Sequence, residues 1–179
     1  MTDKTIPIPA DFDEVKAEIW ESDLILIRNR SGKHVRIAKA SWWNGELFCV
    51  TVRKYRGVTA VPLGQLVRRY PGRIDVYEAN PKNRWENYDR QGATGHLKTM
   101  SADKFDLQAV LLNMLRNIVS TMLFKSETRS EMIAYGADAI RIADRLGGNV
   151  EPLPDRREAR IEASDFVLSP FYHYSFTLK

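Results

Sequence analysis

The chain has 179 residues, of which 44% are hydrophobic and 28% are charged, and its formal net charge is +4. This composition is typical of a globular domain, and the length suffices for one domain with a substantial core. The one cysteine, Cys49, excludes an internal disulfide, an iron–sulfur cluster and a cysteine-rich zinc site. The three histidines are widely spaced, which disfavours a histidine-rich metal site. We therefore expect no metal and no cofactor.

Charge is distributed unevenly along the chain. Residues 1–27 carry two lysines and seven acidic residues, whereas residues 28–73 carry eleven basic residues and a single acid, Glu46. A segment with such a positive excess can contact a polyanion, including nucleic acid. The alternative is that the acidic N-terminal residues pack beside the basic segment and neutralise it.

Neither a membrane span nor a secretion signal is expected. No apolar run approaches 18 residues, which excludes insertion into a bilayer, and the first residues are polar and acidic, which excludes a signal peptide. We expect a protein of the cytoplasm or of a particle assembled there.

The first half of the chain has the pattern of short strands. Asn44-Gly45 separates two strand-like runs, 34–43 and 46–54, and this pair predicts a type I′ hairpin turn. The other elements expected in this half are a short helix over 11–20, strands over 23–27, 58–61 and 73–77, and a helical turn over 62–67.

The second half has helical spacing. Apolar residues recur every three or four positions over 107–122, and a second helix runs to Leu146 from a capping box in which Thr128 is the N-cap. Gly147-Gly148 is expected to end that helix in the left-handed conformation. The segment 166–178 is too apolar for a free tail, so we expect it to pack on the domain.

These elements predict an α+β domain in which a small antiparallel sheet or barrel packs against C-terminal helices. Residues 1–21 form an N-terminal arm with a short helix, and residues 22–179 form the domain. Within it we distinguish a strand half, a helical half and a C-terminal packing tail, over 22–79, 80–148 and 149–179.

The order of motifs resembles a known family. The segments that carry the resemblance are Ser22-Asp23-Leu24-Ile25-Leu26-Ile27-Arg28, Ala38-Lys39-Ala40-Ser41-Trp42-Trp43, Glu46-Leu47-Phe48-Cys49-Val50, Pro71-Gly72-Arg73-Ile74-Asp75-Val76-Tyr77, Ser130-Glu131 and the closing 169–178. Together they resemble the circularly permuted NlpC-type, papain-like cysteine hydrolases, the YiiX/YebB-like group. The resemblance implies a papain-like fold.

The resemblance also implies a catalytic histidine on the strand before the paired tryptophans, a polar partner on the next strand, and a nucleophilic cysteine opening the later helix. Here Arg129 precedes Ser130-Glu131, Arg36 stands at the histidine position with His34 two residues earlier, and Thr51 stands at the partner position. A guanidinium cannot act as a nucleophile, so we expect a degenerate site with no catalytic residues.

Two classes of function follow. The first is a pseudoenzyme retained as a structural or protein-binding module, associating with other subunits or with itself; the resemblance implies a phage virion, in the neck, tail or capsid. The alternative is an active amidase or peptidase acting on peptidoglycan or acyl-linked substrates, with His34 and a nucleophile drawn from Cys49, Ser126, Thr128 and Ser130.

A third candidate function is the binding of an anion in the cleft where the resembling family binds its substrate. Arg129 at a helix start and Arg36 could together hold a carboxylate or a phosphate. The alternative for Arg129 is an internal ion pair with an acidic residue of its own chain.

Overall fold

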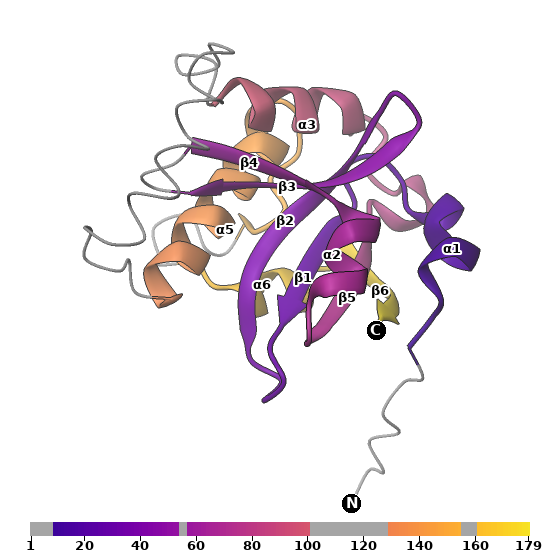
Figure 1. Ribbon diagram of the computed structural model, residues 1–179. Coiled ribbons are helices and arrows are strands. Elements are labelled where there is room, and N and C mark those ends of the chain that lie inside the picture. The colour runs from indigo at the N-terminus through magenta and orange to yellow at the C-terminus, as the bar shows by residue number, and fades with distance from the viewer. Residues whose placement is uncertain (1–8, 54–56, 101–128, 155–160) are drawn as a thin grey trace, which may run out of the picture.

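The computed structural model describes residues 9–53, 57–100, 129–154 and 161–179. A six-stranded sheet with strand order β4-β3-β2-β1-β5-β6 forms its centre, and every neighbouring pair is antiparallel (Figure 1). Helices lie against both faces of the sheet, so the predicted α+β class is confirmed.

The first four strands follow one another as a meander. They are β1 (Leu24–Arg28), β2 (His34–Trp43), β3 (Glu46–Arg53) and β4 (Gly57–Pro62). Asn44 and Gly45 both have positive φ, 50° and 80°, as a type I′ turn requires. The predicted hairpin is therefore confirmed, and it sets the register in which Trp43 pairs with Glu46.

The other side of the sheet is built from distant parts of the chain. Strand β5 (Arg73–Ala79) pairs with β1, and β6 (Tyr172–Leu178) pairs with β5 as the edge strand. The apolar C-terminal segment thus packs on the domain as a strand. Ala10 adds an isolated parallel bridge to Leu178 on the outer edge of β6.

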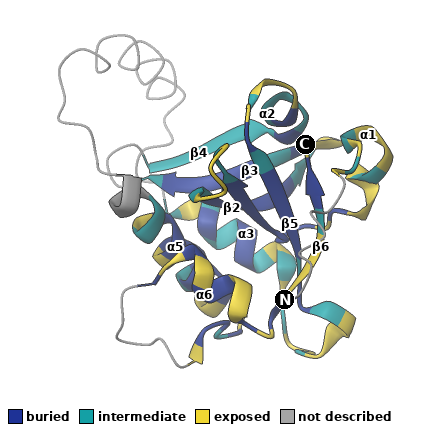
Figure 2. Cartoon of the chain, turned by 90° about the horizontal axis from the view of Figure 1, so that it is seen from below, coloured by how far each residue is buried: buried dark blue, intermediate teal, exposed yellow. Residues whose placement is uncertain are grey.

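Two apolar cores lie on opposite faces of the sheet. One face is covered by α1 (Phe12–Val15) and α2 (Leu63–Arg69), and the other by α3 (Arg90–Thr99), α5 (Arg129–Leu146) and α6 (Ala163–Leu168). Figure 2 shows the buried strands between these helices, whose outer faces are exposed. The expected helix over 11–20 is shorter, since α1 passes into a 3₁₀ turn, η1 (Lys16–Glu18).

The glycine pair after α5 has another role than the predicted one. The helix ends at Leu146 as expected, but the left-handed residue is Asn149, with φ of 60°. A Cβ on Gly147 would overlap the carbonyl oxygen of Gly92, and one on Gly148 would lie 2.6 Å from the ring of Tyr88. The two glycines let α5 approach α3 closely, and the prediction of a left-handed glycine stop is wrong.

Several expectations fall outside the described residues. They are the helix over 107–122, the cap at Thr128 and the candidate nucleophile Ser126. A second 3₁₀ turn, η2 (Pro81–Asn83), follows β5. No helix in the described ranges is long and apolar enough to cross a bilayer.

Candidate functional site

A cavity of about 200 Å³ opens where three elements converge. His34 comes from the first residue of β2, Ile133 and Ala134 come from the second turn of α5, and residues 161–164 come from the start of α6. The backbone N–H of Glu162 donates a hydrogen bond of 2.8 Å to Asp165 Oδ2, which fixes the start of α6. The cavity therefore lies between the imidazole of His34 and the N-terminal half of α5.

A β-bulge decides which residue of β2 faces this cavity. Ile27 pairs with Arg36, but the next residue, Arg28, pairs with His34, so Val35 is an extra residue in β2. Neighbouring residues of β1 point to opposite faces, and their partners do the same. His34 therefore lies on the face covered by α5, and Arg36 lies on the face of Ile27, covered by α1 and α2.

The imidazole of His34 is half-buried. Burial lowers its pKa below the usual value near 6.5; the negative charge of Asp75 opposes this shift and the positive charge of Arg28 adds to it. The side chain is therefore mostly neutral at pH 7. It makes no hydrogen bond to any residue that the structure describes, which leaves both ring nitrogens open to the cavity or to solvent.

Cys49 lies on the opposite face of the sheet from the cavity of His34. It sits in the middle of β3, only 3% exposed, within the apolar core beneath α1 and α2. Burial raises the pKa of its thiol to about 12, although the charge of Arg36 opposes the shift. A thiol in this state is protonated and shielded, unlike the accessible thiolate that a nucleophile or a thiolate ligand requires.

Thr51 serves the contact between α5 and the sheet. Its hydroxyl donates a hydrogen bond of 2.6 Å to the carbonyl of Ile37, and Gly136 of α5 packs above both residues. The side chain is buried and makes no hydrogen bond to His34. Its role in the described structure is therefore packing at the strand pair.

Arg129 is the first residue of α5, one turn before Ile133 of the cavity. Its side chain lies outside the described part of the structure, as do those of Thr128 and Ser130. The pairing of Arg129 with Arg36 therefore stays a prediction.

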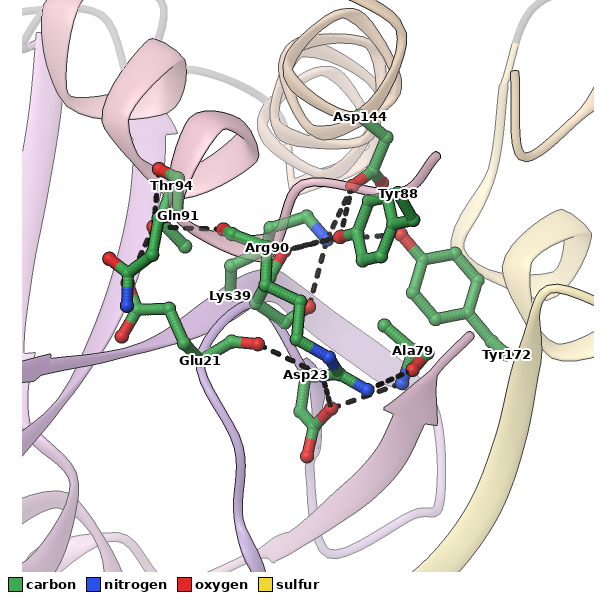
Figure 3. Close-up of polar contacts among 11 residues, drawn as sticks. Glu21, Asp23, Lys39, Ala79, Tyr88, Arg90, Gln91, Thr94, Asp144 and Tyr172 are labelled. Atoms are coloured by element: carbon green, nitrogen blue, oxygen red, sulfur yellow. Dashed lines mark hydrogen bonds and ion pairs between the residues drawn. The ribbon is translucent and has the colours of Figure 1, made fainter. Parts of the chain in front are cut away.

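A second polar cluster, absent from the sequence predictions, lies under the other half of α5. Lys39 of β2 is fully buried and its Nζ lies 2.8 Å from Asp144 Oδ1 (Figure 3). The ammonium also donates to the carbonyl and the hydroxyl of Ser22, each at 2.9 Å, and to the hydroxyl of Tyr172 at 3.2 Å.

The phenols complete the surroundings of this ion pair. Tyr88 donates a hydrogen bond of 2.9 Å to Asp144 Oδ1, and Tyr172 donates to Asp144 Oδ2. Burial lowers the pKa of Lys39, against the attraction of Asp144, and burial raises the pKa of both phenols. The phenols therefore stay protonated donors at neutral pH, and the partners of the buried carboxylate come from β2, from β6 and from the segment before α3.

An adjoining set of ion pairs ties α3 to the sheet. Arg90 Nη1 lies 2.8 Å from Asp23 Oδ1, and its guanidinium also donates to the carbonyls of Glu21 and Ala79. The Glu21 carboxylate accepts hydrogen bonds from Ser41 and from Thr94. We call Glu21, Asp23, Lys39, Tyr88, Arg90, Asp144 and Tyr172 the ionic network; it has the geometry of a clamp between the sheet, α3 and α5.

One signal in the sequence could have revealed the ionic network. Lys39 lies between Ile37 and Ser41 at every second position of its strand, so the three side chains share one face. Asp144 follows Ala137 and Ile140 on the apolar stripe of its helix. A charge at an inward position demands a buried partner of opposite sign. Sequence periodicity finds such positions but does not say which two of them meet.

Comparisons with known proteins identify a solved structure with a similar fold. No family model matches the chain. No curated protein matches its sequence. Among solved structures, the protein yiiX from Escherichia coli O157:H7, described as a metalloprotein of the DUF1105 group, matches with a TM-score of 0.52 and 10% identity. The match covers 87% of this chain and 97% of yiiX, so the two chains share their fold over most of their length.

Proposed function

We propose that the chain is a non-catalytic member of the permuted NlpC-type, papain-like group, kept as a structural or protein-binding module. The observation that carries the proposal is the position of Cys49, the only cysteine of the sequence. It is buried on the sheet face opposite to the cavity of His34.

The chemistry of a cysteine hydrolase explains why this position matters. A thiolate forms readily when the thiol lies at a helix N-terminus beside an imidazole, because both favour the negative charge. In this chain the long helix opens with Arg129, and the thiol has a pKa of about 12. The papain-like assignment itself rests on the motif resemblance and on the shared fold with yiiX.

A module of this kind acts by association. The setting that the resemblance implies is a phage particle, where the domain would contact other subunits or further copies of itself. Leu168 and Trp20 are 80% and 62% exposed, and such side chains can be anchors for contacts with a partner.

Metal binding, as in the description of yiiX, is not transferred to this chain. Among the described residues no three His, Cys, Asp or Glu side chains gather as ligands. His34 and Cys49 lie on opposite faces of the sheet.

A second candidate function is hydrolysis by a hydroxyl nucleophile. Ser164 and Glu162 line the same cavity as His34, so this cavity brings together the residue types of a Ser-His-acid site. Ser164 thus adds a further hydroxyl to the candidate nucleophiles Cys49, Ser126, Thr128 and Ser130.

Both candidates are tested by one set of assays on the full chain. A chromogenic acyl ester and dye-labelled peptidoglycan serve as substrates, and sedimentation velocity over a wide concentration range measures self-association. We expect no turnover, no change on Cys49→Ala, and concentration-dependent association. Turnover abolished by Cys49→Ala would overturn the proposal, and turnover abolished by both Ser164→Ala and His34→Ala would establish the second candidate.

A further inference from the structure

We propose that one end of the sheet binds the phosphodiester backbone of a nucleic acid without reading its bases. The surface consists of six basic residues, which we call the basic end: Arg30, Lys33, Arg36, Arg68, Arg69 and Arg73.

The topology brings these residues together from three parts of the chain. Arg73 at the start of β5 pairs with Arg28, the last residue of β1, which leads into the β1–β2 loop with Arg30 and Lys33. Gly72 packs against the backbone of Arg28, so the end of α2 is held beside that loop. In Figure 1 the β1–β2 loop and the start of β5 lie at the same lower end of the sheet.

The charges of the basic end are not neutralised by the described acidic residues. None of its six side chains has an ion pair within the described ranges, and four of them, Arg30, Lys33, Arg68 and Arg69, are exposed.

Three of the described acids of residues 1–27 pair with cations outside the basic end. Asp23 pairs with Arg90, Glu21 lies near Lys98, and Asp13 pairs with Lys16. Glu46 lies at the opposite end of β2. Neutralisation of the basic segment by the arm is therefore not found among the described ion pairs.

The chemistry of the surface favours phosphate. Five of its six residues are arginines, whose planar forks hold two phosphate oxygens at once. Arg73 pairs with Arg28 and Arg36 pairs with Ile27, so these two arginines lie on opposite faces of the sheet, on either side of the β1–β2 loop and two strand spacings of about 4.8 Å apart. A flexible chain of phosphates can follow such a row around the sheet end.

The composition of the surface disfavours other partners. A protein interface has an apolar, charge-depleted centre, and a bilayer surface is usually anchored by exposed apolar residues. The large exposed hydrophobic residues of the described structure, Trp20, Tyr135, Leu146, Val167, Leu168 and Tyr174, all lie outside residues 28–73. No large exposed hydrophobic side chain of the described residues thus accompanies the basic end, which favours contacts with the phosphate backbone alone.

The test is fluorescence anisotropy of the full chain with a labelled DNA duplex of about 20 base pairs, at low and at physiological salt. If four to six phosphates are contacted, the dissociation constant should rise by about 10²–10³-fold between 50 and 200 mM salt. Two duplexes of unrelated sequence should bind equally. A salt-independent affinity or a strong preference for one sequence would overturn the proposal.

Paired charge variants locate the surface. Arg68→Gln/Arg69→Gln and Arg30→Gln/Lys33→Gln should each weaken binding at least tenfold and lower the salt slope. The matched control is Lys82→Gln/Arg84→Gln, which removes two exposed charges at the other end of β5 and should change binding less than twofold. Equal effects of control and test variants would reject the basic end.

Two competitors separate the other polyanions. Polyglutamate and anionic phospholipid vesicles are titrated against the bound duplex. We expect neither to displace it at equal charge concentration; displacement by polyglutamate would identify an acidic protein surface as the ligand, and displacement by vesicles a membrane. Both outcomes would overturn the nucleic-acid proposal, and none of these measurements depends on whether the cavity of His34 is catalytic.

Discussion

The two halves of α5 lie over polar groups of opposite character. Near its C-terminal end, Asp144 is fully buried and bonded to Lys39, Tyr88 and Tyr172. Near its N-terminal end, His34 is half-buried and has no hydrogen bond to a described residue. A group whose partners are all internal holds the fold, whereas a group left open beside a cavity is available to a ligand. We therefore assign the ionic network to stability, whereas the cavity leaves the His34 imidazole accessible to a ligand.

The largest effect should follow from breaking the buried ion pair. Asp144→Asn keeps the shape of the side chain but leaves the charge of Lys39 uncompensated, which should cost about 3–5 kcal/mol in urea denaturation. The folded variant should release the Lys39 proton more readily than the unfolded chain does. Its stability should therefore rise with pH between neutral and mildly alkaline solution, more than that of the wild type.

The control for this change is Asp138→Asn, an exposed acid on the same helix, which should shift stability by less than about 0.5 kcal/mol. The double variant Lys39→Met/Asp144→Leu should recover much of the loss, because it removes both charges. If Asp144→Asn cost no more than the control, the network would not be the clamp described above.

An intermediate effect is expected where α5 crosses α3. Gly147→Ala places a Cβ against the backbone of Gly92 and should cost about 1–3 kcal/mol by overpacking. The matched control is Gly95→Ala in α3, where an added Cβ meets nothing within 4 Å; it should stabilise by about 0.5–1 kcal/mol. Opposite signs in thermal denaturation would support the close approach, and equal signs would contradict it.

The smallest effect on stability should come from the protonation of His34 beside the cavity. The folded pKa of His34 lies below its unfolded value near 6.5, so the unfolded chain binds more protons between these two values. This residue's contribution to stability should therefore fall as the pH drops from 7 to 5, by less than about 1 kcal/mol because solvent reaches half of the ring.

His34→Gln should remove that part of the pH dependence, as seen in denaturation curves at several pH values. His173→Gln, at an exposed position on β6, should leave the pH dependence as in the wild type. A wild-type slope retained in His34→Gln would show that the imidazole of His34 is not the group that titrates.

Local chemistry explains what could be predicted about the fold. Asn44-Gly45 specified the hairpin because few residue pairs tolerate two positive φ angles in succession. An apolar run with β-branched residues predicted β1, and the alternation of apolar and polar residues predicted β5. Gly147-Gly148 misled the prediction, because a glycine after a helix is used either for a left-handed turn or for a close contact, and the contact with α3 is not visible in the sequence.

In the candidate site, too, residue identities follow from the sequence, whereas contacts between distant segments do not. The sequence by itself determined that this chain has one thiol and an arginine at the start of a long helix, since residue identity needs no structure. Only the tertiary structure decided that the Val35 bulge turns His34 toward α5 and Arg36 away, and that Lys39 meets Asp144. Register and long-range pairing depend on how whole elements pack, and a one-residue shift reverses which face a side chain occupies.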